Sequence, residues 1–163
     1  YVYIKSINFI SFNSLINLEI LNLEFNNIEK IELNSFYNLN KLKYLILSNN
    51  FMSQLFPGTL DGLFQLEKLN LSFNKVESIK KDLLNDLINL IELDLSHNNI
   101  KICENESFKY LIYLKHLNFF NNPDLKIQNQ SFNGLESIRN IYFSATVLLN
   151  STFNKLNIKN NLR

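Results

Sequence analysis

The sequence predicts an α/β solenoid of horseshoe shape, in which short parallel strands line the concave face. The first observation is a repeat of 24 residues that returns Asn26, Asn50, Asn74, Asn98 and Asn122 to the same place in the pattern. The second is the alternation in Leu93-Asp94-Leu95, which sends the two leucines to one face and Asp94 to the other, as a short strand requires. A fixed period of this size is typical of an array whose units stack side by side.

Apolar residues at the same period predict the core. One column comprises Leu21, Leu45, Leu69, Leu93, Leu117 and Ile141. Two later columns, which include Cys103 and Phe108, are expected to close the convex side. The segments between these columns are short and interrupted by turn residues, so we expect an irregular convex face with single helical or 3₁₀ turns.

The whole chain, residues 1–163, is interpreted as one array of five full units with a partial unit at each end. The apolar N-terminal stretch is predicted to be a repeat rather than a signal peptide, because Ile4 and Ile7 precede Ile28 and Ile31 by one period. The sequence begins inside a unit and lacks an initiator Met, which suggests a fragment of a longer protein.

The pattern weakens in the last two units. In one of them Asp124 falls at an apolar position, so Leu125 is expected to shift into the core. In the final unit Thr146 replaces the recurring Asn, and Phe153 arrives early.

The recurring Asn residues are predicted to be structural. Each follows a strand at the point where the chain turns and leaves backbone N–H and C=O groups facing an apolar interior. A side-chain amide can donate to one of these groups and accept from another. We therefore expect a ladder of stacked amides along the array, formed by Asn26, Asn50, Asn74, Asn98 and Asn122.

Composition excludes several classes of function. The net charge is +1 and the basic residues are scattered among acidic ones, so we expect no nucleic-acid ligand. No apolar run is long enough to span a membrane within this sequence, although an anchor could lie outside it. No nucleophile, acid–base pair or phosphate loop converges, so we expect neither an enzyme nor a cofactor or metal.

Cys103, the only cysteine, is predicted to be a core residue because its column is otherwise Ile and Leu. A nucleophilic thiol is the alternative.

Polar residues on the concave face form a second set of candidates. His97 and His116 project there, and Lys68, Glu92 and His116 fall side by side across three strands. A His–carboxylate contact is one interpretation, and a solvated row of charges is the other. In the neighbouring column Glu19, Lys43 and Glu67 alternate in charge, which favours pairing between strands.

Aromatic residues separate into two groups by their place in the period. Six phenylalanines fall in core columns: Phe12, Phe36, Phe108, Phe119, Phe132 and Phe143. Others fall at concave positions, where exposed aromatic side chains can anchor a protein partner. The alternative is that they lean on neighbouring strands. The predicted ligand-binding set is Tyr44, Ile46, Phe73, His97, His116, Phe120 and Tyr142.

Four Asn-x-Ser/Thr triplets are potential glycosylation sites. Three of them, at Asn105, Asn129 and Asn150, are followed by Phe and share one place in the period, on the convex or descending side. A glycan there would leave the concave sheet free. Repeat duplication could also copy the triplet without any glycan. The fourth, Asn70, is predicted to be concave, where a glycan would obstruct binding.

The consensus L-x-x-L-x-L-x-x-N-x-I-x-x-I followed by F-x-x-L, clearest from Leu90 to Asn98, resembles the typical class of leucine-rich repeat. That class is familiar from Toll-like receptors, Slit-like guidance proteins, chaoptin-like adhesion proteins and small proteoglycans. The resemblance implies recognition of a protein or glycan by the concave sheet of an extracellular or membrane-anchored ectodomain, in adhesion or receptor signalling. Such proteins usually carry cysteine-rich caps, and none is visible here. The alternative is a cytoplasmic scaffold or regulatory subunit that wraps a partner protein.

Overall fold

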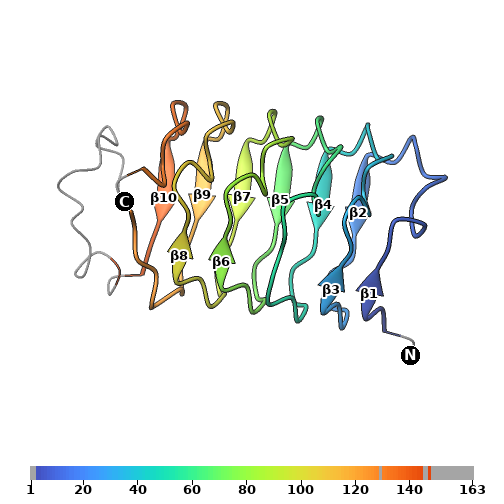
Figure 1. Ribbon diagram of the computed structural model, residues 1–163, viewed down its shortest axis with the longest axis horizontal. Helices are drawn as coiled ribbons and strands as arrows, with labels where there is room; N and C mark the ends of the chain where they lie inside the picture. The colour runs from blue at the N-terminus through green and yellow to red at the C-terminus, as the bar shows by residue number, and fades with distance from the viewer. Residues whose placement is uncertain (1–2, 129, 145–146, 148–163) are drawn as a thin grey trace.

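The computed structural model describes residues 3–128, 130–144 and 147, and it forms a solenoid of parallel strands (Figure 1). The central feature is a six-stranded sheet with the order β10-β9-β7-β5-β4-β2. Its strands are β2 (Ile20–Asn22), β4 (Tyr44–Ile46), β5 (Lys68–Asn70), β7 (Glu92–Asp94), β9 (His116–Asn118) and β10 (Asn140–Tyr142). Each strand contributes one slice of the array, as the repeat predicted.

Residues that pair across neighbouring strands of this sheet are one period apart in the sequence. Leu45 pairs with Leu21 on one side and with Leu69 on the other, and Leu93 pairs with Leu117. The middle residue of each strand is buried, while its two neighbours are half-buried or exposed. This is the alternation that a sheet covered on one face demands.

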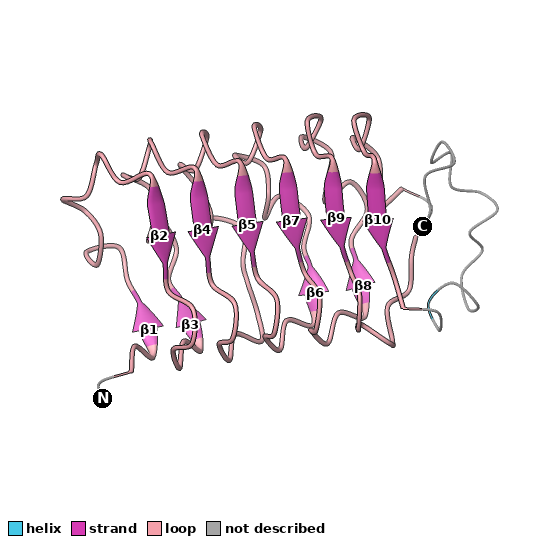
Figure 2. Ribbon diagram, turned by 180° about the vertical axis from the view of Figure 1, so that it is seen from behind, coloured by secondary structure: helices cyan, strands magenta, loops and turns pink. Residues whose placement is uncertain are grey.

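Shorter strands lie on the descending side, where the chain runs back from the concave sheet (Figure 2). They are β1 (Ser6–Ile7) paired with β3 (Lys30–Ile31), and β6 (Ser78–Ile79) paired with β8 (Ile102–Cys103). An isolated bridge joins Ile102 to Lys126. The N-terminal partial unit thus takes its place in the array through β1, in line with its interpretation as a repeat.

The convex side of the described array consists of turns and not of helices. The turns are closed by hydrogen bonds three residues apart: Leu39 N–H donates to Phe36 C=O, and Leu42 N–H donates to Leu39 C=O. All three side chains are buried. Apolar anchors every three residues suit successive tight turns better than a helix of 3.6 residues per turn. The helical part of the predicted α/β class is therefore not confirmed.

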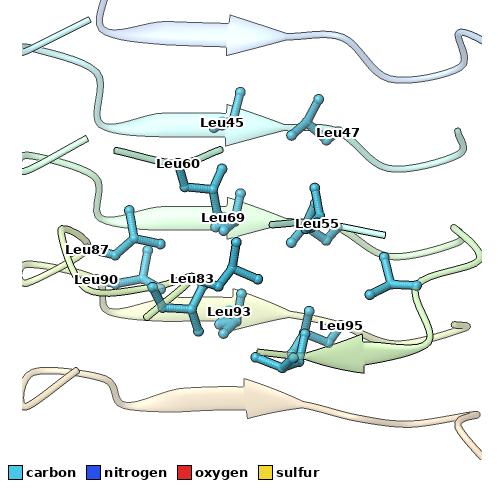
Figure 3. Packing of buried hydrophobic residues seen from close by; sticks show 14 of the residues in the cluster. Leu45, Leu47, Leu55, Leu60, Leu69, Leu83, Leu87, Leu90, Leu93 and Leu95 are labelled. Carbon is cyan, nitrogen blue, oxygen red and sulfur yellow. The ribbon is translucent and has the colours of Figure 1, made fainter. Parts of the chain in front are cut away.

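The core runs the length of the array between sheet and turns, and leucines from successive units interdigitate in it (Figure 3). Cys103 is 1% exposed, and burial raises the pKa of its thiol, so it is an inert core residue as predicted. Leu125 is buried while Asp124 is exposed, which confirms the expected shift. Thr146 and Phe153 lie outside the described residues.

The amide ladder is present. Asn98 Oδ1 accepts a hydrogen bond from Val76 N–H at 2.9 Å, and Asn98 Nδ2 donates to Leu71 C=O in the preceding unit and to Leu95 C=O in its own. The same bonds recur one period away at Asn50, Asn74 and Asn122. Asn26 accepts a longer bond of 3.4 Å from Ile4 N–H. Each amide therefore joins two neighbouring units, and its role is structural.

Candidate functional site: a concave groove with an aromatic rim

The concave sheet contains a groove of about 520 Å³ that crosses its strands from β2 to β9. The outward-facing residues of successive strands line it, and they change from apolar to polar along the array. Ile20, Tyr44 and Ile46 form the apolar end. The polar end comprises Lys68, Asn70, Glu92, Asp94, His116 and Asn118.

An ion pair lies in the middle of the groove. Lys68 Nζ is 2.9 Å from Glu92 Oε1, and the hydrogen bond to this carboxylate raises the pKa of Lys68. The same ammonium lies 5.9 Å from the ring centroid of Tyr44. His116 is beside Glu92 in the register of the sheet, but no ion pair joins these two side chains. The predicted row of charges is confirmed, and the His–carboxylate contact is not formed.

Several polar groove residues also fasten the ends of the strands. Asn70 Oδ1 accepts hydrogen bonds from Ser72 N–H and Ser72 Oγ, and Asp94 Oδ1 accepts one from Ser96 N–H at 2.9 Å. Asn22 and Asn118 make the same contact to the residue two positions ahead. A side-chain oxygen that caps a turn in this way is typical of Asn and Asp. Asn70, Asp94 and Asn118 therefore stabilise the strand ends as well as lining the groove.

A stack of aromatic rings borders the groove beyond the carboxyl ends of the strands. Phe73 and His97 are parallel, with ring centroids 4.0 Å apart, and Phe120 meets His97 edge-on at 5.8 Å. The imidazole is held by Asn121, whose Nδ2 lies 3.0 Å from His97 Nδ1. Phe73 and Phe120 are nevertheless about half exposed, at 49% and 51%. We call Phe73, His97 and Phe120 the aromatic rim.

Two rim residues belong to a column of the repeat in which every described member has a positive φ. Phe73 and His97 both have a φ of 53°, in the left-handed region, as does Phe25 at 54° in the same column. The other two members of that column with positive φ are Asn49 and Asn121. Asn tolerates this conformation, whereas a bulky side chain such as Phe adopts it at a cost. Residues held in such conformations often occur at binding sites, so the strain at Phe73 favours a functional role for this rim residue.

The structure divides the predicted set into three. Tyr44, Ile46 and His116 line the groove, and Phe73, His97 and Phe120 form the rim. Tyr142 is 41% exposed on the edge strand β10 and lies outside the groove lining. The prediction missed Asn118, although it occupies the same place in the period as Asp94 and could have been found there. Whether these residues bind a ligand stays a prediction.

The glycosylation triplets have a structural component. Asn105 is exposed, but Ser107 of its triplet is buried, and its Oγ has no hydrogen-bond partner among the described residues. One period later Ser131 Oγ donates to Cys103 C=O at 2.8 Å. Ser35 occupies the same place, outside any such triplet, and donates to the backbone in the same way. Packing therefore explains the recurrent Ser-Phe. Of each triplet, only the Asn still indicates glycosylation. Asn129 and Asn150 lie outside the described residues.

Two further features are absent from the described residues. No group of three or more His, Cys, Asp or Glu side chains is arranged to hold a metal ion. No helix in this part of the chain is both long and apolar enough to cross a membrane.

Comparisons with known proteins agree with this geometry. Residues 16–76 and 64–123 match a family model described as leucine rich repeat. The sequence matches no curated protein. Among solved structures, the chain is similar to the crystal structure of a TLR13–ssRNA13 complex, with a TM-score of 0.61 and 28% sequence identity. The similarity covers 86% of this chain but only 23% of that one, so this chain spans less than a quarter of its length.

Proposed function

Because the chain belongs to the leucine-rich repeat family, whose concave sheet it reproduces, we propose that it is a ligand-binding recognition module. The groove and the aromatic rim form the binding face. The observation that carries this proposal is the rim itself, in which half-exposed rings are kept stacked on a backbone that Phe adopts at a cost. Exposed aromatic side chains on a rigid scaffold are the usual anchors of protein interfaces.

The charges of the groove favour a protein ligand. Lys68 is neutralised by Glu92, and Asp94 adds a further negative charge beside them. A polyanion such as RNA is bound mainly through cations that are free to contact phosphate. An apolar end next to a polar end suits a peptide surface that presents apolar side chains beside polar or basic ones.

The similarity to a TLR13–ssRNA13 complex bears against excluding nucleic acid outright. A glycan is the other alternative, because aromatic faces also stack on sugars. The test therefore measures RNA binding and glycan binding separately from protein binding.

The test is a binding screen that compares two double variants with the unmodified chain. The probes are a panel of purified extracellular protein domains, a glycan array and single-stranded RNA. The concave variant carries Tyr44→Ala and Phe120→Ala. The matched control carries Tyr37→Ala and Phe56→Ala, which remove the same residue types from exposed positions on other faces.

We expect a protein probe whose affinity falls at least about tenfold with the concave variant and is unchanged with the control. Equal binding by all three proteins would reject the concave site. Binding of RNA or glycans alone would reject the protein ligand and keep the site.

We further propose that this module is part of an extracellular or membrane-anchored receptor or adhesion protein. The exposed Asn105, on a side that leaves the groove free, supports this location. The rival is a cytoplasmic scaffold that uses the same concave face. Glycosidase treatment of protein from its native source distinguishes them: a gain in electrophoretic mobility, abolished by Asn105→Gln, supports the extracellular location, and no change favours the cytoplasmic one.

A further inference from the structure

A second surface lies on the flank where the strands of the concave sheet begin, the upper edge in Figure 2. Three apolar side chains one period apart are exposed there: Phe64 (43%), Ile88 (43%) and Ile112 (41%). Each occupies a turn between two buried leucines, so the core holds its backbone in place while the side chain points outward. Tyr113 extends this stripe and is also exposed. Apolar residues repeated on one face of three successive units are typical of an interaction surface.

A shallow groove of about 300 Å³ lies beside the stripe. Its lining residues are Gln65, Glu67, Asn89, Ile91, Tyr113 and Lys115. Glu67, Ile91 and Lys115 occupy the position just before β5, β7 and β9, so the acidic and basic residues lie two units apart with Ile91 between them. We call the stripe and this groove together the strand-start flank.

The charges of this flank differ from those of the first units. There, Glu19 and Lys43 are one unit apart and form an ion pair at 3.0 Å, which raises the pKa of Lys43. Glu67 interacts electrostatically with Lys43 and Lys68, but neither Glu67 nor Lys115 forms an ion pair with any described residue. Two strand steps of roughly 4.8 Å each separate their backbones, and their side chains do not pair with each other within one chain.

A twofold axis through Ile91 and Ile88 would give both charged residues a partner in a second chain. It would place Glu67 of one chain against Lys115 of the other, and the reverse, forming two equivalent ion pairs. The same operation packs Phe64 against Ile112 of the second chain, brings the two Ile88 side chains together, and sets Gln65 opposite Tyr113. A surface that is complementary to itself about an axis is what a symmetric dimer requires.

We propose that the strand-start flank binds a second copy of this chain in an isologous dimer. The two copies meet at the edges of their solenoids, so both concave grooves remain open and can bind independently. The dimer thus adds a second interface and does not depend on the ligand proposed above.

The test is a charge-reversal cycle read by sedimentation velocity and light scattering over a range of concentrations. We expect the unmodified chain to dimerise and Lys115→Glu to weaken the dimer roughly a hundredfold, because Glu67 would then face a glutamate twice. Glu67→Lys should do the same. The double variant Glu67→Lys/Lys115→Glu should restore the dimer, and mixing the two single variants should give a heterodimer.

Two controls make the cycle decisive. Lys126→Glu reverses an exposed lysine away from this flank and should leave the dimer unchanged. Ile88→Asp should abolish the dimer while circular dichroism reports an unchanged fold, because this side chain is already exposed. A chain that is monomeric at every concentration would overturn the proposal. So would single variants that dimerise normally, or a double variant that fails to recover.

Discussion

At the scale of single residues, backbone strain distinguishes side chains that the repeat pattern treats alike. The residue before each ladder Asn turns into the left-handed region, and in two units this residue is itself an asparagine. Phe25 adopts the same φ with a side chain that is 69% exposed and buries little apolar surface in return. Its presence there lowers stability with no packing gain that the structure shows.

The first prediction follows from that strain. Phe25→Asn should raise the free energy of unfolding by about 1 kcal/mol, because Asn adopts positive φ readily and the exposed ring contributes little. Urea denaturation measures the change. Phe9→Asn is the matched control, since Phe9 is also exposed but has no positive φ, and it should give no gain. Equal changes in the two variants would contradict the strain argument.

At the scale of elements, the units are joined by side-chain amides as well as by strand pairing. Asn98 is 4% exposed and contacts the backbone of its own unit and of the preceding one. Asn99, the next residue, is exposed, and only its backbone N–H reaches the preceding unit, at Val76 C=O. Two adjacent residues of one type therefore differ in role.

Asn98→Ala should lower the free energy of unfolding by about 1–3 kcal/mol, because Val76 N–H and the carbonyl groups would be left buried without their partner. Asn99→Ala keeps its backbone bond and should change stability by less than about 0.5 kcal/mol. Thermal or urea unfolding of the pair measures both effects. Similar losses in the two variants would contradict the ladder.

The elements also show where sequence reasoning failed. The period placed the strands of the concave sheet correctly, since alternation within a strand and spacing between units follow from burial alone, but it did not predict the short strands β1, β3, β6 and β8. It predicted an irregular convex face but not the type of turn there, because apolar anchors three residues apart suit both a 3₁₀ or helical turn and successive β-turns. The tertiary packing of Phe36, Leu39 and Leu42 decides between these alternatives.

Across the whole molecule, the period alone likewise predicts only part of the candidate site. The period identified which residues face the concave side, including Tyr44 and Phe73. It could not show that Asp94 caps a turn, or that His97 stacks on Phe73, because these contacts depend on rotamers and backbone angles. The period places Glu67 and Lys115 two units apart, but it could not show that both line one groove on the flank.

We propose above that the ligand binds the concave groove and the aromatic rim. Hydroxyl-radical footprinting of the chain, with and without a protein bound in the screen, tests it directly because aromatic side chains report their own solvent exposure. We expect protection of Tyr44, Phe73 and Phe120, with Tyr37 and Phe56 as reactive as in the free chain. Protection of Tyr37 and Phe56 with an unprotected rim would contradict it.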